Sequence, residues 1–294
     1  MFTFFKKVLI AFCVEAFFVS TLGYAQADKL PFMNQSKIRL MIPAGERYFG
    51  ELVLENPSDK PKKVRLYLED WRYLPDATGA KEFLPAGSTF FSACPWIEFS
   101  PSEVVIPAFG KQRINYTVFV PAEASGVKFA SLFFETVVKQ DTALKEELSL
   151  GLEVNIRVAT LFYVEVKGTV KRSARISSFE VVSLGKEGLE IKLDFENTGN
   201  SDITTEGSFY LMNKKGQVFA RGSFNSLYTF PGGKGVLKGI WKEIVPPGEY
   251  DLVINIDLGK ALQELGLGSG PLFIKEASVT IGENNQVVRV GILQ

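Results

Sequence analysis

Short runs of alternating or β-branched residues, separated by proline, glycine, asparagine and aspartate, recur along the whole chain, and long helical periodicity is absent. Such runs place one row of side chains on a buried face, which is the pattern of β-strands. We expect one short helix, at 260–265. The sequence therefore predicts an all-β protein, with strands at 37–42, 48–55, 63–73, 104–106, 113–120, 128–138, 148–166, 176–183, 189–196, 207–212, 218–223, 236–241, 250–257 and 273–281.

The two halves of the chain repeat the same order of features. Each half holds about seven expected strands with turn residues between them, as an immunoglobulin-like sandwich requires. The strand end Leu52–Asn56 leads into an asparagine-headed turn, and Leu193–Asn197 echoes it in the second half, since asparagine tolerates the tight backbone of a turn. We expect two tandem immunoglobulin-like β-sandwich domains, at residues 28–167 and 168–294.

The N-terminus has the parts of a signal peptide. Lys6-Lys7 supplies a positive region, an apolar stretch follows at 8–22, and Ala25-Gln26-Ala27 fits a small-x-small cleavage site. We expect residues 1–27 to be removed and the mature chain to be periplasmic or otherwise exported. A retained membrane anchor is the alternative, and no later segment predicts a membrane span.

The expected mature chain is nearly neutral. Loss of Lys6, Lys7 and Glu15 from the 33 basic and 33 acidic residues leaves 31 and 32, a net charge of −1. A chain without a basic field offers no general attraction to phosphate backbones, so we expect no nucleic-acid partner.

Residues that carry covalent chemistry are scarce. The chain has no histidine, which excludes the usual hydrolase triads, and Cys94 is its one mature cysteine, too few for a disulfide or a zinc site. We expect Cys94 to be a buried structural thiol rather than a reactive one. We expect Glu69 and Asp70 to be a solvated strand end rather than an acid pair, because adjacent strand residues point to opposite faces. We predict no metal, no cofactor and no enzymatic activity.

The segment from Leu148 to Arg157 is the most informative stretch of the chain. Every second residue is aliphatic while the residues between are small or polar, so one face of a strand forms a ladder of apolar side chains. A period of two fits two readings, a strand that lies on its own core and a strand that offers the ladder to another protein. The ladder consists of Leu148, Leu150, Leu152, Val154 and Ile156.

The first half of the chain resembles the N-terminal domain of the periplasmic pilus-assembly chaperones, the PapD-like family. The matching segments follow one another in the same order as in the family, over about 130 residues. The second half, with Glu196–Asn200, resembles the immunoglobulin-like second domain of distant bacterial members. The matching pieces of the first half are Lys37–Ile42, Leu54–Asn56, Trp96–Pro101, Pro107–Gly110, Arg113–Tyr116, Val120-Pro121 and Gly126–Ala130.

The resemblance implies a chaperone that lends a strand to an incomplete, exported fimbrial or surface subunit. By position, the ladder from Leu148 to Ile156 would be the donor strand. Arg39 and Arg157 would bind the carboxylate at the end of the subunit, because a guanidinium can bind a carboxylate through two hydrogen bonds. An outer-membrane usher is a further partner that the resemblance suggests.

The chain departs from the family pattern at one point of this strand. Residues 158–160 separate Arg157 from the aromatic end at Leu161–Tyr163, so the strand would bulge or the anchor would be lost. The second half is also longer than in well-known members. Because a fold does not determine a function, a structural surface protein or adhesin built of tandem immunoglobulin-like domains is the rival interpretation.

Overall fold

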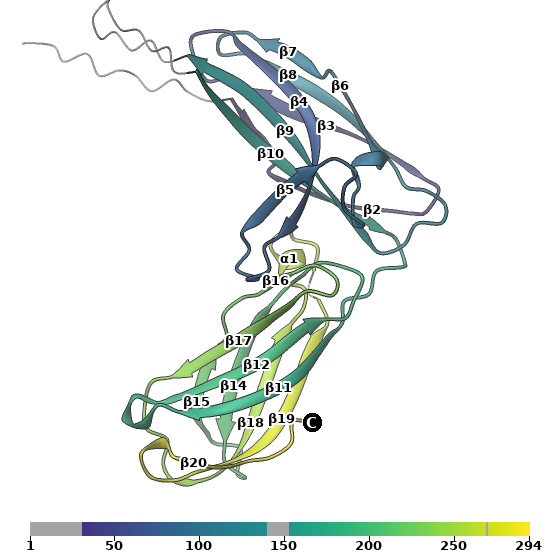
Figure 1. Cartoon of the computed structure of the whole chain (residues 1–294). Helices are drawn as coiled ribbons and strands as arrows, with labels where there is room; N and C mark the ends of the chain where they lie inside the picture. The colour runs from purple at the N-terminus through teal and green to yellow at the C-terminus, as the bar shows by residue number, and fades with distance from the viewer. Residues whose placement is uncertain (1–30, 140–152, 269) are drawn as a thin grey trace, which may run out of the picture.

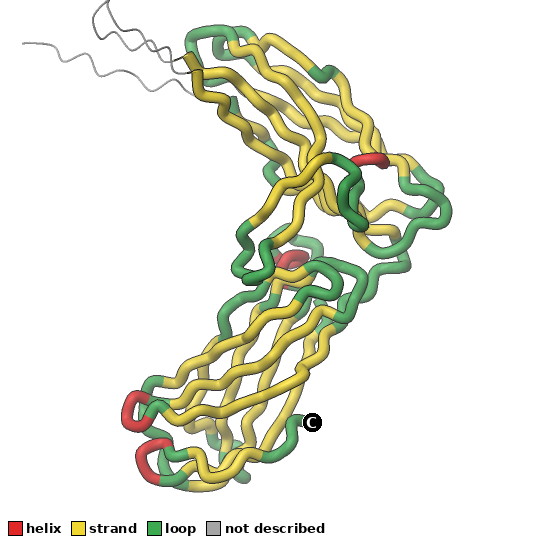
Figure 2. Tube along the Cα trace, in the orientation of Figure 1, coloured by secondary structure: helices red, strands yellow, loops and turns green. Residues whose placement is uncertain are grey.

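The computed structural model describes residues 31–139, 153–268 and 270–294. The expected signal peptide and the ladder residues Leu148, Leu150 and Leu152 lie outside the described residues. Strands dominate the described chain and helices are limited to short turns (Figure 2), so the all-β prediction is confirmed. The strands form two elongated immunoglobulin-like units that meet at an angle (Figure 1).

The first unit is a sandwich of two sheets. Its buried apolar side chains, among them Leu52, Ile114 and Phe162, form one core between the sheets. One sheet has the order β1-β3-β8-β6, with β1 at Phe32–Met33, β3 at Arg47–Glu55, β8 at Lys111–Phe119 and β6 at Ile97–Ser100. The other has the order β2-β10-β9-β4-β5, with β2 at Lys37–Ile42, β10 at Glu153–Val166, β9 at Val127–Lys139, β4 at Lys62–Tyr73 and β5 at Lys81–Pro85, while β7 at Glu103–Ile106 also pairs with β4.

The second unit is built in the same way. Its core contains Leu193, Phe209 and Leu237. One sheet has the order β11-β12-β17, with β11 at Ala174–Ser183, β12 at Leu189–Asn197 and β17 at Lys234–Trp241. A second has the order β15-β14-β18-β19-β20, with β15 at Val218–Ser223, β14 at Glu206–Met212, β18 at Gly248–Asp257, β19 at Leu272–Ile281 and β20 at Val287–Val290. Short β13 (Ile203–Thr204) pairs with β16 (Tyr228–Thr229), and helix α1 spans Lys260–Gln263.

The echo between the halves corresponds to a shared turn. In the first unit Asn56 directly follows β3, and its backbone N–H donates to the carbonyl of Gly110, which directly precedes β8. In the second unit Asn197 ends β12 and donates to Gly233, which directly precedes β17. Both asparagines are buried and their side-chain amides bond backbone carbonyls. One asparagine in each sandwich therefore fixes the same pair of neighbouring strands.

The hairpin between β4 and β5 joins the two units. Ala77 at its tip is buried among core residues of the second unit, and its carbonyl accepts a hydrogen bond of 2.9 Å from the backbone N–H of Tyr228. Gly79 lies under the Tyr228 ring with a φ of +94°, where an added Cβ would come within 2.9 Å of the ring. The second core is thus completed by a piece of the first unit.

An aromatic cluster covers the rest of the junction. The rings of Phe129 in β9 and Phe230 in the second unit stack at 4.1 Å between centroids. Trp71 packs against both rings, and its indole N–H donates to the carbonyl of Ala130 at 3.1 Å. Because large buried rings contribute much of a packed interface, this cluster holds the two units in one arrangement.

Candidate functional site: the edge of β10 and the domain junction

Strand β10 is paired on both sides along only half of its length. It pairs with β9 throughout, from Glu153 to Glu165, without a shift of register. On its other side β2 runs parallel to it only from Leu161 to Val166. The stretch from Glu153 to Ala159 therefore forms a sheet edge with no strand beside it in the described part of the chain.

The chain before β2 closes this edge at one end. The N–H of Leu161 donates to the carbonyl of Ser36 at 2.9 Å, and the hydroxyl of Thr160 donates to the carbonyl of Gln35 at 2.7 Å. Backbone groups of a strand alternate between its two edges, so those of Asn155, Arg157 and Ala159 point the same way as those of Leu161. These outward groups have no backbone partner among the described residues. They are the free positions of a β-ladder.

The side chains of this edge alternate between two environments. Ile156 and Val158 lie in phase with Phe162, a fully buried residue of the first core. Ile156 itself is half-buried, Val158 is 39% exposed, and both line a shallow apolar depression with Pro31, Val64, Phe134 and Thr136. The core of the first unit is thus incompletely covered beside the free edge, which leaves apolar side chains within reach of an added strand.

The two halves of β10 have different surroundings. From Thr160 to Val166 the inward side chains are buried in the protein's own core. From Glu153 to Ala159 the strand is an edge. Val154 and Ile156 of the predicted ladder lie in this edge half, where they pair with Val138 and Thr136 of β9. The unbroken register also shows that no bulge separates Arg157 from Leu161.

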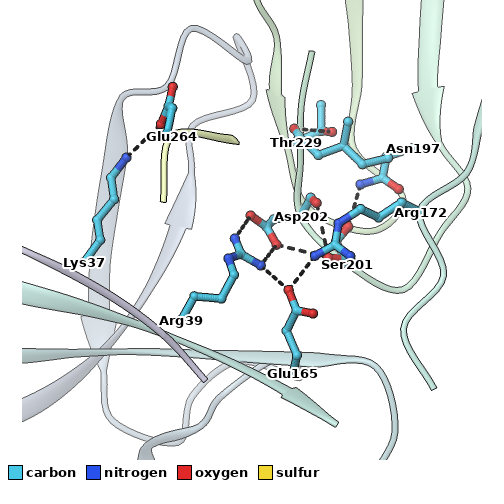
Figure 3. A network of polar contacts seen from close by, with 10 residues as sticks. Lys37, Arg39, Glu165, Arg172, Asn197, Ser201, Asp202, Thr229 and Glu264 are labelled. Atoms are coloured by element: carbon cyan, nitrogen blue, oxygen red, sulfur yellow. Dashed lines mark hydrogen bonds and ion pairs between the residues drawn. The ribbon is translucent and has the colours of Figure 1, made fainter. Parts of the chain in front are cut away.

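Arg39 lies at the domain junction in a network of buried ion pairs (Figure 3). Its Nη1 donates to Glu165 of β10 at 2.5 Å, and Nη1 and Nη2 donate to the two carboxylate oxygens of Asp202 at 3.1 and 2.6 Å. Arg172 also donates to Glu165. The side chains of Arg39, Glu165 and Asp202 are each at most 3% exposed. Two cations and two anions therefore balance one another inside the protein.

The charge of Arg39 is stabilised by its partners. Burial alone would lower the pKa of Arg39, but attraction and hydrogen bonding to Asp202 and Glu165 outweigh burial and raise the pKa. The guanidinium also lies 4.3 Å from the ring centre of Tyr163. Burial raises the pKa of the neighbouring hydroxyls of Tyr163 and Tyr73, so both phenols are neutral. Arg39 therefore keeps its charge at neutral pH although it is buried.

Arg157 lies elsewhere on the sheet. Its side chain is 46% exposed, and its guanidinium donates to Glu69 of β4 at 3.0 Å and lies 4.5 Å from the ring centre of Phe133. Arg39 pairs in register with Tyr163, six residues along β10 from Arg157. At about 3.3 Å per residue the two positions are about 20 Å apart. The structure does not bring the two predicted anchor residues together, and the carboxylate-binding role of each stays a prediction.

Glu69 and Asp70 point to different surroundings, as adjacent strand residues should. Glu69 pairs with Arg157, whereas Asp70 is buried, so the expectation of a solvated strand end is wrong for Asp70. Asp70 accepts hydrogen bonds from Ser92, Cys94 and two backbone N–H groups of the loop after β5. Burial alone would raise the pKa of Asp70, but these hydrogen bonds together lower it. The carboxylate fixes the fold of this loop.

Cys94 is buried, and its Sγ lies 3.0 Å from a carboxylate oxygen of Asp70. Burial, together with the nearby carboxylate, raises the pKa of the thiol to about 12. The thiol is therefore protonated at neutral pH and poorly nucleophilic, as expected of a structural cysteine.

The sequence did not indicate the partners of Arg39. Asp202 and Arg172 belong to the second unit, and Asp202 is separated from Arg39 by 163 positions. Glu165 gave a weak signal, because an acidic residue stands between Val164 and Val166 in an otherwise apolar strand end. Among the described residues no cluster of acidic or cysteine side chains could hold a metal ion. No helix in the same residues is long and apolar enough to cross a membrane.

Several solved structures are similar to this chain. The Class 5 fimbriae chaperone CfaA matches with a TM-score of 0.46 and 16% identity, covering 84% of this chain and 98% of that one. A chain of the Salmonella enterica SafA pilin in complex with the SafB chaperone matches with a TM-score of 0.40 and 13% identity, covering 84% and 97%. The E. coli chaperone DraB matches with a TM-score of 0.36 and 13% identity, covering 83% and 97%.

Many of the similar solved structures are fimbrial chaperones, the family that the sequence resembles. No protein-family model matches the chain, and no curated protein matches it significantly in sequence.

Proposed function

We propose that this protein is a periplasmic, chaperone-like binding protein that holds an exported fimbrial or surface subunit by strand addition and catalyses no covalent reaction. The observation that carries the proposal is the free edge of β10 between Glu153 and Ala159. A strand added to a sheet edge gains affinity from backbone hydrogen bonds and specificity from alternate side chains. β10 offers both.

The added strand would bond the outward backbone groups of Asn155, Arg157 and Ala159. The side chains of Ile156 and Val158 would enter the incomplete core of the subunit, because they are apolar and only partly covered in the free protein. Natural sheets usually protect a bare edge with short strands, charges or proline. Here the apolar residues next to the edge favour a partner instead.

The test is recovery of a subunit from cells that co-express this protein with exported subunits from neighbouring genes. Asn155→Pro removes one outward N–H and no bond to β9, so the protein should fold while recovery falls by about fivefold, the equivalent of one hydrogen bond. Ile156→Asp places a charge among the inserted side chains and should reduce recovery at least tenfold.

Val105→Asp is the matched control. Val105 is an exposed valine of β7, on a different strand of the same unit, and its replacement should leave recovery unchanged. Thermal unfolding of each variant separates loss of binding from loss of folding. Equal recovery by the wild type and all three folded variants would exclude strand addition at β10.

A further inference from the structure

We infer that the subunit is recognised by its strand and not by its terminal carboxylate, because Asp202 and Glu165 already supply, within the same chain, the carboxylates that Arg39 binds. The inference rests on the proposed function. It replaces the expectation that Arg39 and Arg157 together bind a chain end, and it predicts that an internal segment of a subunit can occupy the edge of β10 as well as a C-terminal one.

The first argument is the accessibility of Arg39. Its side chain is 3% exposed, and both terminal nitrogens donate to carboxylates of the protein. Its Nε is buried without a partner among the described residues, so this nitrogen also offers no face to an outside group. A subunit carboxylate would have to open the junction and displace Asp202, leaving a buried aspartate without its cation, which is strongly unfavourable.

The second argument is the chemistry at the closed end of the edge. A strand that runs parallel to β10 would end beside Thr160, where the chain turns into β2. The groups at this point are the Thr160 hydroxyl and the Gln35 carbonyl, which are bonded to each other. Neither is a cation, and a carbonyl oxygen repels a carboxylate. The site accommodates a continuing or capped chain better than a charged end.

The third argument concerns the two exposed cations nearby. Arg157 lies within the free edge rather than at its end, and it is paired with Glu69 and stacked on Phe133. Lys37 is in register with Leu161 at the closed end, but it is 42% exposed and already bridged to Glu264 at 3.4 Å (Figure 3). An exposed ion pair of this kind alters affinity by less than about fivefold.

The test compares two forms of one peptide on the full mature protein. The probe is a synthetic strand peptide of about ten residues, N-acetylated, with valine alternating with threonine, lysine and glutamate, fluorescein-labelled and made either as the free acid or as the C-terminal amide. Fluorescence anisotropy gives both dissociation constants. We expect the acid and the amide to bind within about fivefold of each other, and Asn155→Pro to weaken both.

The variants Lys37→Gln and Arg39→Met test whether either cation causes tighter binding of the free-acid peptide than of the amide. In agreement with the inference, Lys37→Gln should leave the ratio of the two dissociation constants unchanged. A tenfold or larger preference for the acid that either variant abolishes would overturn the inference while leaving strand addition intact. Failure of both peptides to bind would overturn strand addition, and the inference with it.

Discussion

Replacement of Arg39 by methionine should destabilise the protein more than any other loss of a single charge at the junction. Methionine keeps most of the volume of the side chain but removes the cation, so Asp202, with a side chain 1% exposed, is left without its main partner. Glu165 keeps Arg172. Removing one partner of a buried ion pair typically costs about 3–5 kcal/mol, and we expect a loss in that range.

The assay is urea unfolding at neutral pH, followed by tryptophan fluorescence and by circular dichroism. Trp71 lies in the aromatic cluster of the junction, so its fluorescence reports separation of the units. Arg157→Met is the matched control, since it removes the same cation from an exposed pair and should cost no more than about 1 kcal/mol.

A double variant isolates the uncompensated charge. Arg39→Met with Asp202→Asn replaces the stranded carboxylate by a neutral amide and should recover about 1–3 kcal/mol relative to Arg39→Met alone. The reasoning is refuted if Arg39→Met costs no more than Arg157→Met, or if the double variant is no more stable than Arg39→Met.

Three further predictions concern single sites. Cys94 should react with a thiol reagent at pH 8 at least about a hundredfold more slowly in the native protein than in urea, because a thiol with a pKa of about 12 is almost fully protonated. Folding lowers the pKa of Asp70, so the ionised carboxylate stabilises the fold above the ordinary aspartate pKa. This stabilisation is lost as the pH falls through the folded-state pKa. The difference in free energy of unfolding between wild type and Asp70→Asn should therefore be largest near neutral pH and vanish in acid. Gly79→Ala should cost about 1 kcal/mol more in urea unfolding than Gly216→Ala, because both glycines have a positive φ but only Gly79 lies against a ring, that of Tyr228.

Most strands could be predicted because their signal is local. The expected strands at 37–42 and 218–223 coincide with β2 and β15, since each is a run of alternating or β-branched residues between turn residues. β5, β6 and β20 were not predicted. β5 and β20 do not alternate cleanly, and β6 has only four residues, so their pairing with a neighbouring strand is not revealed by a local pattern.

The free edge of β10 and the surroundings of Arg39 also differ in how far a local sequence pattern reveals them. The alternation from Leu148 to Ile156 is visible in the sequence and predicts a strand for binding, and its residues Val154 and Ile156 lie in the free edge of β10. The environment of Arg39 was not visible, because its charge is met by Asp202 across a domain boundary and no local pattern links the two residues. A basic residue in a strand indicates that a partner is needed, but only the fold shows whether that partner is in the same chain.

The ion-pair network also determines how much of β10 remains free. In β2, Ile38, Leu40 and Ile42 face the first core, while Arg39 faces the junction. A slip of β2 by one residue would turn Arg39 into an apolar core and expose its neighbours, because side chains alternate along a strand.

We therefore expect the pairs from Arg39 to Glu165 and Asp202, together with the apolar face of β2, to favour the observed register, in which Lys37 lies opposite Leu161. That register stops β2 short of Thr160 and leaves Glu153–Ala159 open. A buried ion pair can thus specify one arrangement over its alternatives, and we expect this one to help set the length of the edge on which the proposed binding depends.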